Sequence, residues 1–431
     1  MATAEITKPP SVPVVAPPLR VTFAWTLVGN IIYAGCQWGM ISVLAKLGST
    51  TAVGQFSLAL AITAPVFMLT NLALRGVQAT DARCEFSFAD YFSLRWLGTA
   101  IALLAVLGIL VLSRRSSTII PIVLFVTLAK SVEALTDIIA GLMQKHERLD
   151  QVAVSMTLKG ISSVSAFSVV FLISHSVAAA SAALLVTWAT VFLCYDLRRA
   201  IRILGPDAIY FRFDRSRLME LAKLAAPVGV VLALVSLNVN VPRYVVEKYC
   251  GIGQLGVFAA LAYLVIVVNL LVNALGQSAV VRLSRQFAHG NVSGFTRLLQ
   301  KMCLFAVAGA FLAIILAHLF GRTALLLLYG PEYQPYTGVL FVMVASSGVA
   351  AVASFLGYGM TAARQFREQL PVSAATLAVC AGLSFLLTPK YGIMGAAWAI
   401  LVSGLVQILG NLVFLRFAVR ARLRHLQPAY V

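Results

Sequence analysis

Long apolar segments recur along the chain after its first twenty residues, and this recurrence limits the possible folds more than any other feature. Each segment has roughly 18 to 25 residues, which at a rise of about 1.5 Å per residue spans a hydrocarbon layer of about 30 Å. The segments lie at 21–44, 51–75, 94–112, 118–143, 152–174, 177–195, 218–242, 254–276, 302–320, 337–360, 371–388 and 393–416. Alternating strands of about ten residues are absent, so we predict an all-α integral membrane protein with about twelve transmembrane helices.

The composition agrees with this prediction and excludes other classes of protein. The 431 residues are 60% hydrophobic and 11% charged, whereas soluble domains are about 45 to 50% apolar and about 25% charged. A soluble globule and a disordered chain are both excluded. The cysteines are scattered through apolar segments and the histidines lack metal-ligand spacing, so we expect neither disulfides nor a metal. The proline-rich stretch 1–20 has no apolar run and predicts a disordered tail rather than a signal peptide.

The distribution of basic residues predicts the orientation in the membrane. The net charge is +18, and most Lys and Arg residues fall in alternate connections between the apolar segments. The other connections carry only Lys46, Arg114, Arg115, Arg243, Lys248, Arg322 and Lys390. Because basic loops stay in the cytoplasm, both termini are predicted on that side. A basic surface facing anionic lipid accounts for the charge, and no nucleic-acid partner is expected.

A weak internal repeat divides the chain into two halves. At an offset of 202 residues the following positions coincide: Lys46 with Lys248, Gly54 with Gly256, Phe56 with Phe258, Asn71 with Asn273, Arg83 with Arg285 and Arg95 with Arg297. We therefore predict two six-helix bundles, 21–195 and 218–417, related as parallel repeats. A basic cytoplasmic linker, 196–217, joins them, and a basic tail, 418–431, follows. Such repeats in transporters pack around a central site.

Ionisable residues inside the predicted helices are the first group of candidate site residues. Each costs at least about 2.5 to 3.5 kcal/mol at the centre of a bilayer, so such residues face a protein interior or a watery cavity. Lys130, Glu133 and Asp137 share one helical face, and Lys159 lies at a similar depth on the next helix. Two interpretations remain open. Lys159 only neutralises Asp137 or Glu133 and locks two helices together, or these side chains line a translocation cavity, in which Lys130, Glu133 and Asp137 couple transport to a cation.

Polar residues nearer the helix ends form a second candidate group, for substrate binding. Its members, besides Lys159, are Asn30, Gln37, Asn71, Arg75, Arg243 and Asn273. Guanidinium groups bind phosphate bidentately, so inward-facing arginines suit an anionic substrate, while the amides either donate to hydroxyls or bond to neighbouring helices. For Arg282, Arg285 and Arg364 we favour a position at the lipid headgroups.

Catalytic signatures are lacking. Gly251, Gly253 and Gly256 match G-x-G-x-x-G, but they lie in a short loop between membrane helices and not after a strand. No other nucleotide, metal or nucleophile motif occurs, and no loop is long enough for a catalytic domain. The chain is therefore predicted to be neither an enzyme nor a binder of a cofactor.

Glycine and aromatic patterns along the chain resemble those of bacterial polysaccharide and O-antigen flippases. These patterns lie at 47–59, 137–144, 256–260, 328–333 and 391–397. The family belongs to the multidrug/oligosaccharidyl-lipid/polysaccharide exporter (MOP) superfamily. The resemblance implies a V-shaped pair of bundles in the bacterial inner membrane, which flips an undecaprenyl-pyrophosphate-linked sugar repeat unit to the periplasmic leaflet. A polysaccharide polymerase and a chain-length regulator are the expected protein partners.

Three other functions remain as alternatives. A cation-coupled drug or metabolite antiporter of the same superfamily should have an acidic cavity rather than one rimmed with arginine. A membrane glycosyltransferase or polymerase should have a large periplasmic loop, and the outer loops here are short. A scaffold protein would not need charges buried in its helices.

Overall fold

The computed structural model describes residues 19–81, 84–113, 115–205 and 210–426, and their regular secondary structure is entirely helical. The helices of the first part are α1 (Leu19–Leu47), α2 (Thr50–Asn71), α3 (Leu74–Thr80), α4 (Phe88–Leu112), α5 (Ile119–Lys145), α6 (Leu149–Ser174), α7 (Val177–Val191) and α8 (Leu197–Leu204). Those of the second part are α9 (Arg215–Leu264), α10 (Ile266–Ala288), α11 (Val292–Tyr329), α12 (Thr337–Ala362), α13 (Phe366–Tyr391) and α14 (Ile393–Leu426). A π-helical turn, Phe192–Asp196, joins α7 to α8, and a 3-10 turn, Pro331–Tyr336, precedes α12. The predicted disordered tail lies almost wholly outside the described residues.

Eleven helical segments of the described chain are long and apolar enough to cross a membrane. The prediction of an all-α membrane protein is therefore confirmed. One predicted span is misplaced: 254–276 is divided between the end of α9 and the start of α10. The chain bends at Gly251, whose φ of 85° is left-handed, and helical structure continues to Ala288. Hydropathy missed this extension because the end of α10 carries arginines at 282 and 285.

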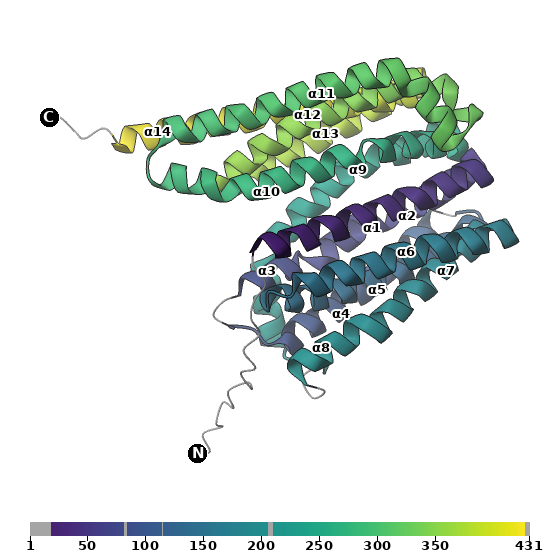
Figure 1. The fold of residues 1–431 in the computed structure, drawn as a ribbon, viewed down its shortest axis with the longest axis horizontal. Helices are drawn as coiled ribbons and strands as arrows, with labels where there is room; N and C mark the ends of the chain where they lie inside the picture. The colour runs from purple at the N-terminus through teal and green to yellow at the C-terminus, as the bar shows by residue number, and fades with distance from the viewer. Residues whose placement is uncertain (1–18, 82–83, 114, 206–209, 427–431) are drawn as a thin grey trace.

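The helices form two groups that approach each other at one end and diverge at the other (Figure 1). One group holds α1 to α8, and the other holds α10 to α14, with α9 running between them. We call α1 to α8 the N-terminal half and α9 to α14 the C-terminal half. The two halves diverge at the end where α1 begins and α14 ends. This arrangement is the V shape that the resemblance to the flippases implied.

The apolar core follows the same pattern. One large cluster spans both halves where they approach, with Phe56 and Phe167 from the N-terminal half and Phe258 and Tyr329 from the C-terminal half. Separate clusters fill each half at the diverging end, one around Met143 of α5 and others within the C-terminal half. The largest core that the described halves share thus lies at the closed end of the V, and a smaller one joins Leu74, Tyr91 and Ile138 of the N-terminal half to Leu218 and Leu221 at the start of α9.

Helix starts are set by capping side chains as well as by hydropathy. Ser87 and Asp90 form a reciprocal capping box at the start of α4, which begins six residues before the predicted span at 94. Asp214 caps α9 through the backbone N–H groups of Ser216 and Arg217. The predicted linker 196–217 thus contains α8 and the first turn of α9. At the other end of the chain α14 continues to Leu426, past its predicted end at 416.

Candidate functional site

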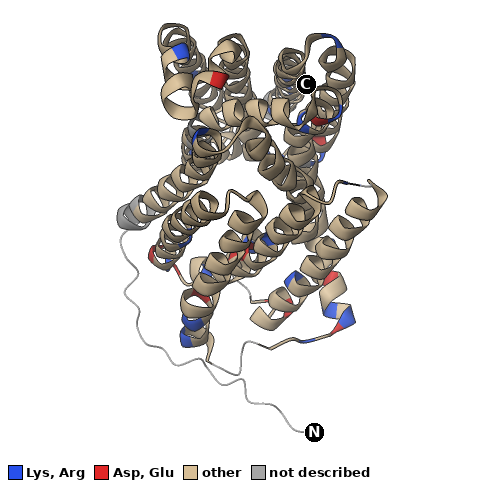
Figure 2. Cartoon of the chain, turned by 90° about the vertical axis from the view of Figure 1, so that its right-hand side faces the viewer, with Lys and Arg blue, Asp and Glu red and all other residues tan. Residues whose placement is uncertain are grey.

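Charged residues are sparse along the helices, and most of the ribbon carries other residues (Figure 2). The exceptions inside the membrane spans therefore define the candidate site. Most of them converge on α5, which packs against α2, α3, α4 and α7 in the N-terminal half. As predicted, Lys130, Glu133 and Asp137 lie along α5, but the structure divides them between two separate clusters.

The first cluster is centred on Glu133. Its carboxylate binds Lys130 Nζ at 2.6 Å and accepts a hydrogen bond of 2.8 Å from the Tyr33 hydroxyl on α1. Lys130 also lies 5.5 Å from the centre of the Trp188 ring on α7, a cation–π contact. Gln37, one turn along α1, interacts with the Tyr33 hydroxyl. The cluster thus joins three helices, and it includes three of the predicted site residues.

The second cluster is centred on Asp137, which binds two arginines. Arg95 Nη2 lies 3.0 Å from one carboxylate oxygen, and Arg75 Nη1 lies 3.4 Å from the other. Arg75 reaches Asp137 because Leu72 and Ala73 adopt left-handed backbone conformations that separate α2 from α3. It was predicted at the end of a single helix, whereas it lies on α3.

Arg95 is a component of this cluster that sequence analysis missed. Its side chain is completely buried, yet its Nε and Nη1 atoms have no hydrogen-bond partner in the described structure. The sequence signal was present, since Arg95 is an ionisable residue in the second position of a predicted span. In the internal repeat it coincides with Arg297. One carboxylate between two guanidinium groups leaves this cluster with a net positive charge.

The position of Lys159 corrects one prediction. It does not pair with Asp137 or Glu133, but lies 3.1 Å from Asp196, and both side chains are at least 95% buried. Asp196 ends the π-helical turn that joins α7 to α8. This wider turn holds one more residue than an α-helical turn and brings into the core a carboxylate that was predicted to lie in the linker.

Arg243 stands apart from these clusters, on α9. Its Nη1 donates a hydrogen bond of 3.1 Å to the Asn240 side chain, and no carboxylate pairs with it in the described structure. The next residue, Tyr244, donates to the carbonyl of Ala61 on α2, which fixes this part of α9 against the N-terminal half. Arg243 therefore lies on the part of α9 that packs against α2 of the N-terminal half.

The remaining predicted residues do not join these clusters through any hydrogen bond or ion pair in the described structure. Asn71 ends α2 with its side-chain oxygen buried and without a partner in the described structure. Asn273 accepts a hydrogen bond of 3.1 Å from the Tyr358 hydroxyl on α12. Asn30 is half-buried on α1. Among the described residues no group of His, Cys, Asp and Glu side chains could hold a metal.

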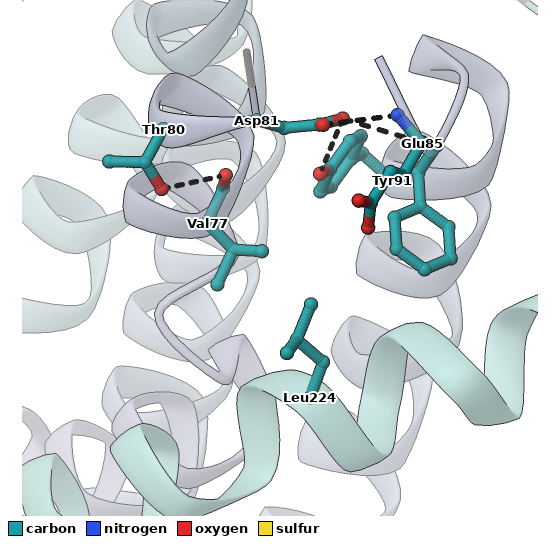
Figure 3. A pocket seen from close by; sticks show the side chains of 7 residues that line it. Val77, Thr80, Asp81, Glu85, Tyr91 and Leu224 are labelled. Carbon is teal, nitrogen blue, oxygen red and sulfur yellow. Dashed lines mark hydrogen bonds between the residues drawn. The ribbon is translucent and has the colours of Figure 1, made fainter. Parts of the chain in front are cut away.

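A polar cavity lies where α3 and α4 meet the start of α9 (Figure 3). It has a volume of about 290 Å³. Asp81 accepts hydrogen bonds there from the backbone N–H groups of Glu85 and Phe86 and from the Tyr91 hydroxyl, and Lys145 lies at 3.7 Å. Burial acts to raise the pKa of Asp81, but these hydrogen bonds and the Lys145 charge outweigh it and lower the pKa.

Comparison with solved structures defines the class of protein. The fold is similar to the inward-facing conformation of a multidrug resistance MATE family transporter of the MOP superfamily, with a TM-score of 0.73, 11% identity and coverage of 93% of this chain and 99% of that chain. It is also similar to the outward-facing conformation of such a transporter, with a TM-score of 0.58 and 12% identity over 93% of this chain and 95% of that chain. A third similar structure is a MOP superfamily transporter from Pyrococcus furiosus, described as having a binding pocket of reverse polarity. Its TM-score is 0.64, with 13% identity over 93% of this chain and 95% of that chain. The chain is thus a multi-pass membrane protein with the MOP superfamily fold.

One relative connects this fold to polysaccharide synthesis. The chain is 29% identical over 395 residues to the capsular polysaccharide biosynthesis protein CapF of Staphylococcus aureus, which covers 91% of this chain and 98% of that protein. No family model matches the chain. The resemblance to the polysaccharide exporter branch of the superfamily is therefore confirmed, and the structural homologues are transporters rather than enzymes.

Proposed function

We propose that this protein flips an undecaprenyl-pyrophosphate-linked oligosaccharide repeat unit from the cytoplasmic to the periplasmic leaflet of a bacterial inner membrane. The relationship to CapF supports a role in the synthesis of a surface polysaccharide. Moving a free oligosaccharide through hydrocarbon would desolvate many hydroxyls at a few kcal/mol each, so a polar path between the halves is required. The lipid chain can stay in the bilayer while the sugar takes this path.

The excess of positive charge inside the membrane spans is the observation that carries the proposal. The cations are Arg75, Arg95, Lys130 and Arg243, and the carboxylates beside them are Glu133 and Asp137, while Lys159 is neutralised by Asp196. Arg243 in particular forms no ion pair with a carboxylate in the described structure, and it lies where α9 packs against the N-terminal half. A pyrophosphate satisfies such groups, whereas a cationic drug is repelled by them.

The arrangement of the halves supports alternating access from the cytoplasmic side. The sequence-based orientation puts both termini in the cytoplasm, and the halves diverge at that end (Figure 1). The fold also matches an inward-facing transporter better than an outward-facing one. We assign the described conformation to the state that takes up substrate from the cytoplasmic leaflet, with a polymerase and a chain-length regulator acting on the flipped product.

A deletion strain tests the function, and Arg243 tests the site. Loss of the gene should abolish surface polymer and trap the glycolipid on the cytoplasmic face. Arg243→Gln should lower export at least about tenfold, since it removes a charge-assisted contact of about 1.5 to 3 kcal/mol. Arg243→Lys should rescue it only partly, because Lys lacks the bidentate geometry. Arg322→Gln, which removes an exposed arginine of α11, is the matched control. Normal polymer with a changed drug susceptibility in the deletion strain would instead establish the antiporter.

Glu133 is the candidate for coupling to a cation. It holds Lys130 and Tyr33 together across α1 and α5, so a change in its charge would loosen two helices of the N-terminal half. Asp137 is the weaker candidate, because it pairs with two arginines and not with a group on another face of the site. Glu133→Gln should remove the pH dependence of transport while the protein still reaches the membrane. An unchanged pH profile would exclude Glu133 from coupling.

A further inference from the structure

A basic cavity lies at the diverging end of the C-terminal half, apart from the site described above. Three helices end around it: α10, α12 and α14. Its volume is about 560 Å³, far more than the roughly 30 Å³ that one water molecule occupies in the liquid. The lining residues are Ser284, Arg285, Phe287, Ala288, His289, Ala362, Ala363, Arg364 and Arg422. The site thus combines three arginines and a histidine with an apolar wall.

The described residues that line this cavity carry positive charge without a balancing negative one. None of them is a carboxylate. Within the described part of the chain, Arg285, Arg364 and Arg422 form no ion pair. Arginines at helix C-termini often compensate the backbone carbonyls there, and Arg422 does so, since its Nη2 donates to the carbonyl of Ala288 at 2.5 Å. Arg285 and Arg364 make no such bond in the described structure, which leaves both guanidinium groups for a ligand.

The backbone conformation of Arg364 helps to place its side chain at the cavity. Arg364 has a φ of +60°, in the left-handed region, directly after the end of α12. Glycine is the usual residue at this position because a side chain there costs about 1 kcal/mol or more. The fold instead holds an arginine in this conformation, with its exposed side chain at the cavity. This conformation, which Leu72, Ala73, Cys84, Glu147 and His175 also adopt, sets where the Arg364 side chain leaves the backbone.

The combination of a phosphate-binding rim and an apolar wall fits one class of ligand. A free inorganic anion would use the arginines but not the surfaces of Phe287, Ala362 and Ala363. A lipid phosphate uses both, because its acyl or prenyl chain starts next to the phosphate. The cavity also lies at the ends of membrane-spanning helices, on the side predicted to face anionic cytoplasmic lipid.

We propose that this cavity binds the phosphate group of a membrane lipid. The ligand is either an anionic phospholipid of the bilayer or an isoprenoid phosphate, which share the same recognised chemistry. The proposal does not depend on the proposed transport function, since it requires only that the protein lies in a membrane. Binding there ties α10, α12 and α14 together on the side where the halves diverge.

Binding of defined lipids to the purified full-length protein tests this proposal. Native mass spectrometry in detergent measures the apparent Kd for phosphatidylglycerol, undecaprenyl phosphate and diacylglycerol, with inorganic phosphate as competitor. We expect both phosphate lipids to bind and diacylglycerol, which lacks the phosphate, to bind at least about tenfold more weakly. The tighter of the two phosphate lipids identifies the source of the ligand. Binding of diacylglycerol as tight as that of both phosphate lipids would overturn the proposal.

Variants separate the site from the general surface charge. Each basic residue near an anionic lipid contributes about fivefold in affinity, so Arg285→Gln with Arg364→Gln should weaken binding about 25-fold. Arg282→Gln is the matched control, because it removes an exposed arginine of α10 that does not line the cavity. Equal losses in the control and the double variant would contradict a built site.

Arg364→Gly distinguishes ligand binding from a structural role. Glycine suits the left-handed backbone, so the melting temperature without lipid should stay the same or rise. The affinity for the phosphate lipid should nevertheless fall about fivefold, because one guanidinium is lost. A fall in stability with unchanged lipid affinity would make Arg364 a structural residue and sink the proposal.

Discussion

Gly54 of α2 and Gly256 of α9 stand 202 residues apart in the sequence and lie against each other in the structure. A Cβ atom on Gly54 would come within 1.9 Å of the Ile252 carbonyl oxygen, and one on Gly256 within 1.8 Å of the Thr50 carbonyl oxygen. Thr50 and Ile252 are themselves 202 residues apart, so each contact is the image of the other. This reciprocity is that of a two-fold axis, which passes between the two glycines where the halves meet.

Alanine at either glycine should therefore destabilise the closed end of the V. Gly54→Ala and Gly256→Ala each place a methyl group on a backbone carbonyl, which cannot move away as a side chain would. Overpacking of this kind costs about 1 to 3 kcal/mol, so we expect a lower melting temperature in detergent and reduced polymer export. Gly35→Ala is the control, because a Cβ there meets nothing within 4 Å. Equal behaviour of all three variants would show that the close approach is not required.

The ion pair between Arg115 and Glu247 should hold the same end of the two halves together. Arg115 precedes α5, Glu247 lies on α9, and both side chains are about four-fifths buried. Arg115→Glu and Glu247→Arg should each reduce export, and the double exchange should restore most of it, because the pair is re-formed with its charges reversed. A double-mutant cycle of melting temperatures and export rates measures the coupling, which we expect to be about 1 kcal/mol. Additive losses would show that the two charges act independently.

The sequence predicted the membrane fold because its strongest signals can be read directly along the chain. Apolar length and loop charge depend on residues close together, and the internal repeat depends on residues at one fixed offset. The repeat even identified Gly54 with Gly256, although nothing in the sequence showed that these two glycines touch. Helix ends were less certain, since capping by Ser87 and the arginines at the end of α10 extend helices beyond the apolar windows.

The partners of the buried charges were harder to predict. Spacing on one helix placed Lys130, Glu133 and Asp137 together on α5, but pairing between helices depends on rotation and local distortion, which divide them between two clusters. Asp196 reaches Lys159 through a π-helical turn, and Arg75 reaches Asp137 through the break before α3. Neither distortion has a sequence signal that we recognised. Arg95 could have been found by treating every charge in a span alike.

Lys159 and Asp196 should act as a structural lock rather than as transport groups. Both side chains are buried, so Lys159→Met or Asp196→Asn alone leaves a charge without its partner and should cost about 3 to 5 kcal/mol. Lys159→Met combined with Asp196→Leu removes both charges and should recover most of the stability. We expect the double variant to export polymer at near-normal rates. A stable double variant that fails to export would instead place this pair in the transport mechanism.

Asp81 should give the cavity of Figure 3 a pH-dependent stability. The pKa of Asp81 in the folded protein lies below its ordinary value of 3.8, because the ionised carboxylate accepts the N–H groups of Glu85 and Phe86 and faces Lys145. Ionised Asp81 therefore stabilises the fold fully at pH values above the ordinary pKa of 3.8. This contribution is lost as the pH falls through the lower pKa of Asp81 in the folded protein.

Asp81→Asn tests this linkage directly. At pH 7 the variant should be about 1 to 3 kcal/mol less stable than the wild type, because it loses charge-assisted hydrogen bonds. The difference should begin to shrink as the pH falls below about 4, where the carboxylate of the unfolded wild type takes up a proton, and it should be lost below the lower pKa of folded Asp81. Melting temperatures in detergent from pH 7 to pH 3 measure it, with Glu85→Gln as the control, since that neighbouring side chain makes no hydrogen bond or ion pair in the described structure. A difference that stays constant over this range would mean that Asp81 contributes through packing and not through its charge.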